Sequence, residues 1–223
     1  TVLITGAGGS IGSELCRQVA RFGPARLVLY ELSEFNLYSI EQDLGERFPG
    51  LELVRLIGDV KDLAHLRAVF GRWAPQVVFH AAAFKHVPLM EDHNAWAALR
   101  NNTLGTYHAA LAAAEVAAER FVLISTDKAV NPVNLYGATK LCEEKLIVQG
   151  NAYAAGSDAK LCCVRYGNVV GSRGSVVPVF REQIASGQLT ITDARMTRFW
   201  ITLDQAVAFV VDEYGDIQGM VTM

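Results

Sequence analysis

The chain has 223 residues, 51% of them hydrophobic, and a formal net charge of −3. This length and composition suffice to bury a substantial core in one domain with a small appendage. The slightly acidic balance excludes nucleic acid and anionic membrane as the main partner. No apolar run approaches the roughly 18 residues of a bilayer span, so we predict no membrane segment in this chain.

Cysteine and histidine spacing exclude a disulfide framework and a zinc site. The four cysteines lack CxxC spacing, and the five histidines lack metal-ligand spacing. We therefore predict reduced thiols, no metal site and a cytoplasmic location. Thr1 falls inside a predicted strand, so this sequence is also compatible with an upstream segment that includes a membrane anchor.

Short apolar runs alternate with longer amphipathic stretches over most of the chain. Nearly continuous apolar strands separated by helices are typical of a parallel sheet covered on both faces. Right-handed crossovers then give a Rossmann-like α/β fold, a doubly wound sheet that binds ligands at the carboxyl ends of its strands. The expected strands are 1–5, 27–30, 51–57, 77–80, 121–124 and 161–164, and the expected helices are 11–21, 35–46, 61–71, one within 94–118, and one over 136–149.

The pattern changes after residue 171. We expect a turn at 172–175, a short helix over 176–185, a loop or short strand at 189–198 and a helix near 203–211. Residues 168–200 are expected to lie over the strand ends.

The first strand runs into a glycine-rich turn that opens a helix. Gly6 permits a tight turn, Gly9 lets backbone approach a pyrophosphate, and Gly12 allows close packing of helix on sheet. We predict that Ser10 caps the helix and that the N–H groups around Ser10 and Ile11 bind phosphate. The alternative is an ordinary glycine turn.

Acidic residues close the second and third strands. Glu31 lies 19 residues beyond Gly12, where a carboxylate can bind both ribose hydroxyls and so favours NAD over NADP. The alternative is a solvated loop acid beside Ser33, which would cap the next helix or contact the cofactor. Asp59 is placed to reach the adenine amino group, with Val60 against the ring, or else Asp59 caps the following helix.

Tyr136 and Lys140 lie four residues apart on one face of a predicted helix. A cation within ~4–6 Å can lower a tyrosine pKa by about 1–3 units, which makes the phenol a usable base. Lys140 would do this while holding the nicotinamide ribose, and Tyr136 would take a proton from a sugar hydroxyl as hydride leaves the same carbon. The alternative is a buried tyrosine and a surface lysine. We therefore divide the chain into an NAD(P)-binding Rossmann domain with the catalytic residues (1–167) and a partial substrate-binding lobe interleaved with it (168–223).

Six segments together resemble one known group of enzymes. They are residues 33–38 (SEFNLY), 81–91 (AAAFKHVPLME), 125–129 (STDKA), 134–140 (NLYGATK), 165–175 (RYGNVVGSRGS) and 196–200 (MTRFW). Over residues 1–212 the chain resembles the extended short-chain dehydrogenase/reductases, and specifically the inverting UDP-N-acetylglucosamine 4,6-dehydratases and related polysaccharide biosynthesis proteins.

The resemblance implies a lyase reaction. Hydride leaves C4 of the sugar, water is eliminated across C5 and C6, and the hydride returns to C6, so that a tightly bound NAD or NADP is recycled. Asp127 would be the acid that assists departure of the C6 hydroxyl, and Lys128 the base near C5. Desolvation would lower the pKa of such a lysine. The alternative is that Asp127 is a helix or turn cap and Lys128 a surface charge.

Further roles follow from the same resemblance. Lys85 and Ala81 would contact the cofactor, and Asn102 would brace the active-site strand unless it is a helix-surface amide. Two arginines suit a diphosphate because the guanidinium grips its oxygens in a bidentate fashion. The residues expected to bind the UDP-sugar are Thr126, Asn168, Arg173, Thr192 and Arg198. A homo-oligomer is expected by analogy.

Two other functions use the same residues. A nucleotide-sugar 4-epimerase needs Tyr136, Lys140 and NAD, but not the pair of Asp127 and Lys128. A non-catalytic dinucleotide-sensing module needs only the cofactor site. The family carries more chain after the helix near 203–211 than this sequence does, so the C-terminal substrate lobe is expected to be truncated, with cofactor binding retained and turnover weakened.

Overall fold

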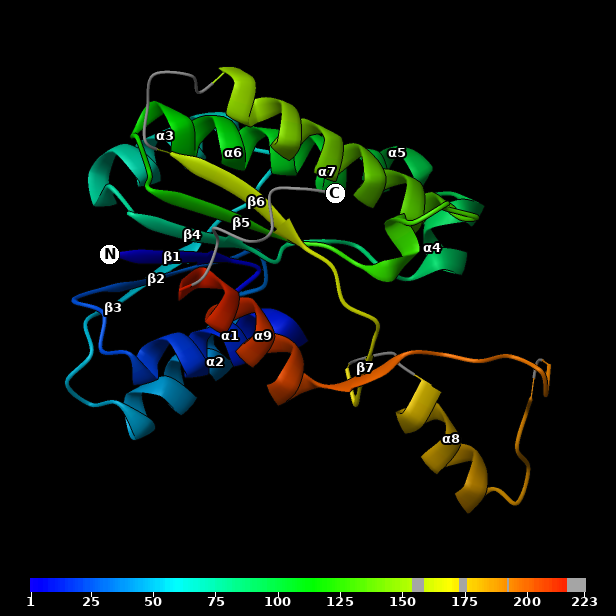
Figure 1. Cartoon of the computed structure of the whole chain (residues 1–223). Helices are drawn as coiled ribbons and strands as arrows, with labels where there is room; N and C mark the ends of the chain where they lie inside the picture. The colour runs from blue at the N-terminus through cyan, green and yellow to red at the C-terminus, as the bar shows by residue number, and fades with distance from the viewer. Residues whose placement is uncertain (154–158, 173–175, 192, 216–223) are drawn as a thin grey trace.

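The computed structural model describes residues 1–153, 159–172, 176–191 and 193–215. Its centre is a six-stranded parallel sheet in the order β3-β2-β1-β4-β5-β6 (Figure 1). The strand order reverses between β1 and β4, as it does in doubly wound sheets. The predicted Rossmann-like fold is therefore confirmed. The strands are β1 (Val2–Thr5), β2 (Leu27–Glu31), β3 (Leu53–Ile57), β4 (Val77–His80), β5 (Arg120–Ile124) and β6 (Lys160–Val164).

Helices cover both faces of the sheet. On one face, α1, α2 and α9 enclose a core that includes Ile4, Leu15 and Val207. On the other, α3, α6 and α7 enclose a core that includes Leu3, Phe70 and Phe121 (Figure 1). Alternate residues of β1 thus enter opposite cores, as the period of a strand requires. The helices are α1 (Ser10–Arg21), α2 (Glu34–Arg47), α3 (Leu63–Trp73), α6 (Gly105–Glu115), α7 (Leu135–Tyr153) and α9 (Leu203–Gly215).

The helix predicted within 94–118 is interrupted. It consists of α5 (Ala95–Leu99), a π-helical turn η1 (Arg100–Leu104) and α6. The wider turn coincides with two adjacent buried amides, Asn101 and Asn102. Such π turns occur often at functional sites. A further short helix that we did not predict, α4 (Val87–Asp92), lies at the carboxyl end of the sheet (Figure 1).

The C-terminal part leaves the sheet and then returns to it. Strands β7 (Asn168–Val170) and β8 (Trp200–Thr202) form a separate two-stranded parallel ladder. Helix α8 (Val176–Ala185), which has the predicted bounds, lies away from the main sheet (Figure 1). Residues 173–175 of the predicted turn are outside the described residues. The division of the chain at residue 167 stays a prediction.

Helix α9 packs against α1 and the sheet. It begins with a capping box, in which Thr202 Oγ1 accepts from Gln205 N (3.2 Å) and Gln205 Oε1 accepts from Thr202 N (3.3 Å). Gln18 on α1 donates to the Asp204 carbonyl at 3.1 Å. Residues after 202 therefore contribute to the same core as β1. Within the described residues, no helix has both the length and the apolar character needed to cross a membrane.

A buried charge on α9 tests this packing. Val207 is fully buried, so Val207→Glu would place an unpaired carboxylate in the core and lower the free energy of unfolding by about 3 kcal/mol or more. Gln205→Glu adds the same charge at an exposed position of the same helix and keeps an oxygen to accept from Thr202 N, so it should change that free energy by less than about 0.5 kcal/mol. Urea unfolding of both variants measures the difference, and equal losses would contradict the placement of α9.

Candidate active site

The glycine-rich turn between β1 and α1 has the geometry that its sequence predicts. Gly6 has φ +63°, a left-handed conformation that favours glycine. A Cβ on Gly12 would lie 2.0 Å from the Gly6 carbonyl oxygen, so only glycine allows this close approach. The predicted cap is wrong by one residue, because Gly9 is the N-cap and Ser10 is the first helical residue. Among the described residues no side chain caps α1, and its first turn holds no acid, which suits a bound anion.

Glu31 joins the glycine turn to the start of α2. Its side chain is only 8% exposed, and its two oxygens accept from Gly8 N at 2.9 Å and Ser33 N at 3.0 Å. The alternative of a solvated loop acid is therefore wrong. Ser33 does cap α2, because its hydroxyl accepts from Asn36 N at 3.3 Å. The carboxylate is thus fixed at the end of β2, beside the turn.

Asp59 does not cap α3. Its side chain accepts from Lys61 N at 2.8 Å and pairs with the Lys61 ammonium at 2.7 Å, whereas Asp62 caps the helix. Val60 is buried, and a Cβ on Gly105 would lie 2.7 Å from its Cγ2. Contact of Asp59 and Val60 with adenine stays a prediction.

Asn102 braces the segment that follows β4. Its amide accepts from Phe84 N at 2.8 Å and donates to Phe84 O at 2.9 Å and to Thr139 Oγ1 at 3.1 Å. A helix-surface amide is therefore excluded, and Asn102 instead joins this segment to α7. Within the same region Ala81 N donates to Thr5 O at 3.2 Å, and Lys85 Nζ donates to Ser172 Oγ at 3.3 Å. Their contacts with a cofactor stay predictions.

Tyr136 and Lys140 come from the first two turns of α7. Lys140 is 2% exposed, and its ammonium donates to Ile124 O at 3.0 Å and to Glu143 Oε2 at 2.8 Å. We expected Lys140 to lower the pKa of Tyr136, but that pKa is raised. Burial is the largest cause, Lys140 opposes it, and the negative charge of Glu143 adds to it.

Sequence reasoning missed the buried partners of Lys140. Glu143 accepts from Thr106 Oγ1 at 3.0 Å, and Thr106 in turn lies 3.0 Å from His80 Nε2. His80 Nδ1 lies 2.8 Å from Thr5 Oγ1, at the end of β1. The Lys140-x-x-Glu143 spacing on a predicted helix was a usable indication, but the contacts with β4 and α6 were not visible in the sequence.

Asp127 and Lys128 follow β5 in a single 3-10 turn, η2 (Asp127–Ala129). Thr126 is the N-cap of this turn, so Asp127 does not have the capping role of the alternative interpretation. Lys128 Nζ donates to Asp127 Oδ1 at 3.1 Å and to Asn168 Oδ1 at 3.2 Å. The side chains of Asp127 and Lys128 are 34% and 37% exposed, so they are open to a ligand while remaining paired.

Glu144 fixes the chain on both sides of this turn. It accepts from Ser125 Oγ at 2.5 Å and from Arg165 Nε at 2.8 Å, and it also pairs with the Arg165 Nη2 group. Backbone bonds continue the contact, since Asp127 N donates to Tyr166 O at 3.0 Å. The end of β5 and the segment after β6 are therefore held together. Sequence reasoning did not identify Glu144.

The other predicted substrate residues are only partly placed. Arg198 is exposed, and its guanidinium donates to Thr197 O at 2.7 Å. It lies two residues before Trp200, whose register partner across the β7–β8 ladder is Asn168. Arg173 and Thr192 lie outside the described residues.

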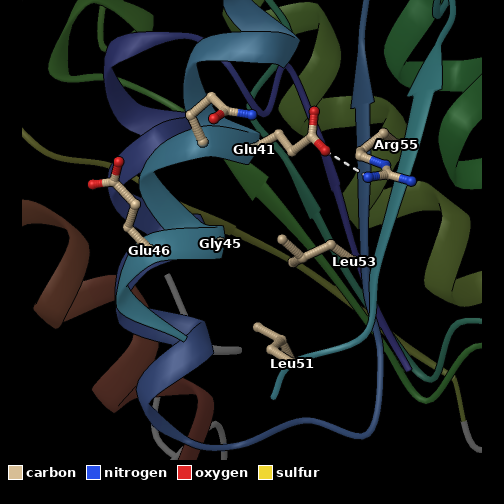
Figure 2. A pocket seen from close by; sticks show the side chains of 7 residues that line it. Glu41, Gly45, Glu46, Leu51, Leu53 and Arg55 are labelled. Carbon is tan, nitrogen blue, oxygen red and sulfur yellow. Dashed lines mark hydrogen bonds and ion pairs between the residues drawn. The ribbon is translucent and has the colours of Figure 1, made fainter. Parts of the chain in front are cut away.

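A surface pocket of ≈350 Å³ lies elsewhere, between α2 and the edge strand β3 (Figure 2). Glu41 and Arg55 pair across it at 2.5 Å. None of its lining residues is a predicted site residue, and its two carboxylates are Glu41, which is paired with Arg55, and Glu46. The candidate site is therefore defined by the contacts at the carboxyl end of the sheet.

The buried His80 predicts a specific pH dependence of stability. Burial, with a smaller contribution from Lys140, lowers the pKa of His80 to about 3. The folded state therefore holds His80 neutral while the unfolded state binds a proton below pH ~6.5. The contribution of neutral His80 to the free energy of unfolding is fully present above pH ~6.5 and is lost as pH falls toward 3. About 2 kcal/mol of it is lost by pH 5.

Urea unfolding at pH 8 and pH 5 checks this expectation. The difference in unfolding free energy between the two pH values should be smaller in His80→Gln than in the parent by about 2 kcal/mol. His93→Gln, at a histidine whose side chain is 85% exposed, should keep the parental difference. A parental difference in His80→Gln would mean that His80 is not held neutral in the fold.

Comparison with known proteins agrees with this arrangement. The family model described as "Polysaccharide biosynthesis protein" matches residues 2–220, slightly beyond the 212 residues of the resemblance. The chain is 46% identical to the capsular polysaccharide biosynthesis protein CapD of Staphylococcus aureus, over 98% of this chain and 36% of CapD. It is 41% identical to a UDP-N-acetylglucosamine 4,6-dehydratase (inverting) of Campylobacter jejuni, over 98% of this chain and 64% of that enzyme.

A solved structure shows the same architecture. The X-ray structure of Pen from Bacillus thuringiensis superposes with a TM-score of 0.86 at 34% identity, over 96% of this chain and 66% of that chain. The chain thus spans about a third of CapD and just under two-thirds of the dehydratase. With the glycine turn, Tyr136, Lys140 and the matched family model in place, the chain belongs to the polysaccharide biosynthesis protein family.

Proposed function

We propose that this chain carries a nucleotide-sugar 4,6-dehydratase activity, a lyase reaction that converts UDP-N-acetylglucosamine to a 4-keto-6-deoxy sugar with inversion at C5. The observation that supports this most strongly is the contact of Lys128 with Asp127 and Asn168 beside Tyr136 and Lys140. A simple oxidation at C4 has no use for a second acid and base. The 41% identity to an inverting dehydratase points the same way.

The cofactor in this proposal is a nicotinamide dinucleotide. The turn at Gly6, Gly9 and Gly12 leaves an uncapped helix N-terminus for the pyrophosphate, and this fits the group. We assign Glu31, whose carboxylate is fixed beside the glycine turn by Gly8 N and Ser33 N, to the ribose hydroxyls; this favours NAD over NADP because a 2′-phosphate would be repelled. When bound there, the nicotinamide would supply the hydride acceptor for oxidation at C4 and the hydride donor for reduction at C6.

Tyr136 and Lys140 serve the oxidation step. Tyr136 takes the proton of the C4 hydroxyl as the hydride departs. Because burial raises the pKa of Tyr136, the nearby Lys140 charge is needed to make the phenol a usable base. Asn102 keeps this helix in register by its contact with Thr139.

Asp127 and Lys128 serve the elimination step. In the ion pair, the amine of Lys128 is protonated and cannot act as a base. The carboxylate of Asp127 is deprotonated and cannot act as an acid. Transfer of that single proton across 3.1 Å gives a neutral amine and a carboxylic acid. The amine then removes the C5 proton and the acid protonates the departing C6 hydroxyl, so the pair holds the required number of protons.

Asn168 orients Lys128 in this scheme, and its own Nδ2 is buried with no hydrogen-bond partner among the described residues. This donor without a partner supports the assignment of Asn168 to the UDP-sugar site. Thr126, Arg173, Thr192 and Arg198 complete the UDP-sugar site of the proposal. A homo-oligomeric state and a cytoplasmic location also remain predictions.

Two substitutions separate the oxidation from the elimination. Tyr136→Phe should lower the rate of nicotinamide reduction at 340 nm by about 10²–10⁴-fold on addition of UDP-N-acetylglucosamine. Lys128→Met should spare that reduction and stop formation of the 4-keto-6-deoxy product, measured by mass spectrometry. Normal product formation by Lys128→Met would remove Lys128 as the base. Interconversion of C4 epimers without loss of water would instead identify a 4-epimerase, and cofactor binding without any reaction would identify a sensing module.

Cofactor preference is tested at Glu31. Isothermal titration should show tighter binding of NAD than of NADP by the parent, and Glu31→Gln should reduce this preference about tenfold, since the repulsion of a 2′-phosphate is lost. Glu34→Gln, in the exposed first turn of α2, should keep the parental preference. A parent that binds NADP more tightly would contradict the assignment of Glu31 to the ribose.

A further inference from the structure

Glu143 is a carboxylate with no exposure to solvent, one turn after Lys140 on α7. Its Oε2 atom accepts from Lys140 Nζ at 2.8 Å and from Thr106 Oγ1 at 3.0 Å. Removing a charge this completely from water is costly unless it is paired. The proposed dehydratase steps do not use Glu143. We therefore looked for another role that its buried charge could have.

The hydrogen bonds that link Glu143, Thr106, His80 and Thr5 have defined donors and acceptors. Thr106 donates its hydroxyl proton to Glu143, so its oxygen is left to accept from His80 Nε2. His80 is neutral, because its pKa is lowered to about 3, and its Nδ1 must then accept from the Thr5 hydroxyl. The carboxylate is therefore held in place from β1 and β4 through α6.

The second oxygen of Glu143 has no such support. Oε1 is buried and has no hydrogen-bond partner among the described residues. An ion pair that served stability alone would be expected to satisfy both oxygens, because a half-satisfied buried carboxylate is destabilising. Among the described residues, the carboxylate is thus bound through one oxygen only, the one that contacts Lys140 and Thr106.

We propose that Glu143 is a positioning residue for Tyr136 and Lys140, the redox pair. Glu143 holds the Lys140 ammonium against the carbonyl of Ile124 and limits how much of the positive charge of Lys140 acts on Tyr136. This inference rests on the proposed function only in taking Tyr136 and Lys140 as that pair. Glu143 need not touch the substrate to act in this way.

Several charged or titratable groups face the pair, and the test has to separate Glu143 from them. Those that influence Tyr136 are Lys140 and Glu143 on α7, Asp127 on η2, the Thr126 side chain after β5 and Tyr166 after β6. Those that face Glu143 are Lys140, Thr106 on α6 and, through Thr106, His80 on β4. Glu144 acts on Lys140 more weakly, and its carboxylate is bound to Arg165 and Ser125.

The sign of the effect follows from the charges. The Glu143 carboxylate raises the pKa of Tyr136 and of Lys140 because it disfavours loss of a proton from either. With a neutral amide in its place, the same site holds an ammonium without a counter-charge. The full charge of Lys140 then acts on Tyr136, so the phenol should release its proton at lower pH.

The test is a titration of the tyrosinate absorbance at 295 nm in the NAD-bound protein. Subtraction of the matching Tyr136→Phe protein isolates the signal of Tyr136. Glu143→Gln has the same shape without the charge, and we expect the Tyr136 midpoint to move down by about 1 pH unit or more. An unchanged midpoint in folded Glu143→Gln would overturn the proposal.

Thr106→Val is the matched control, because it removes the hydrogen bond to Glu143 but keeps the charge. Its Tyr136 midpoint should stay at or above that of the parent. A downward movement as large as that of Glu143→Gln would show that packing, and not the carboxylate charge, sets the midpoint, and the proposal would fail.

If Glu143→Gln does not fold, a second comparison, between Lys140→Met and Lys140→Met/Glu143→Gln, still tests the proposal. In Lys140→Met the buried ammonium is absent, so loss of the carboxylate leaves no unpaired charge. Because Glu143 is argued to act on Tyr136 through Lys140, Tyr136 should titrate at nearly the same pH in Lys140→Met/Glu143→Gln as in Lys140→Met, and a fall of about 1 pH unit or more between the two would contradict the proposal. The titration needs no turnover, so it stands or falls independently of whether the protein is a dehydratase.

Discussion

The contact of the Lys128 ammonium with Asp127 and Asn168 is the interaction on which the proposed function depends. The two oxygens that accept from Lys128 come from different parts of the chain. Asp127 Oδ1 lies directly after β5, and Asn168 Oδ1 lies at the start of β7. They meet because Glu144 grips Ser125 and Arg165, and because Asp127 N donates to the carbonyl of Tyr166. Parallel strands bring their carboxyl ends to one edge of the sheet, and these bonds then fix the last few ångströms.

The two lysine pairs in the site have opposite surroundings. Lys140 and Glu143 are buried, so their charges interact strongly and any change in one is felt by its neighbours. Lys128 and Asp127 are about one-third exposed, where water screens the pair and a ligand can replace one partner. A buried pair with fixed contacts suits the proposed oxidation, in which the pKa of the Tyr136 phenol has to stay constant. A more open pair suits an elimination in which both members exchange protons with the substrate.

Much of the fold follows from local patterns in the sequence. The apolar runs predict all six strands of the main sheet, because the inner strands of a parallel sheet are buried on both faces. The edge strand β3 is still mostly apolar, although Arg55 and Ile57 are exposed. The glycine turn is equally readable, since only glycine tolerates the φ of Gly6 and the close approach at Gly12. The cap at Gly9 was missed because serine is the better intrinsic N-cap, and the backbone at the turn overrides that preference here.

What escaped prediction depends on contacts between distant segments. His80, Thr106 and Glu143 are far apart in the sequence, and nothing in any one helix or strand reveals their meeting. The pKa of Tyr136 is raised and not lowered mainly because the phenol is buried, and the buried acid Glu143 adds to the rise; a pattern of tyrosine and lysine shows neither. The π turn at η1 likewise coincides with contacts of Asn102 with the distant residues Phe84 and Thr139.

The central claim is that an amine and a carboxyl side by side at the end of β5 remove water from a sugar after its oxidation. Nuclear magnetic resonance of the product formed from UDP-N-acetylglucosamine in deuterated water tests it most directly. The account predicts a 4-keto-6-deoxy product with one solvent deuteron at C5 and inverted configuration there. A product that retains the original C5 proton would contradict it.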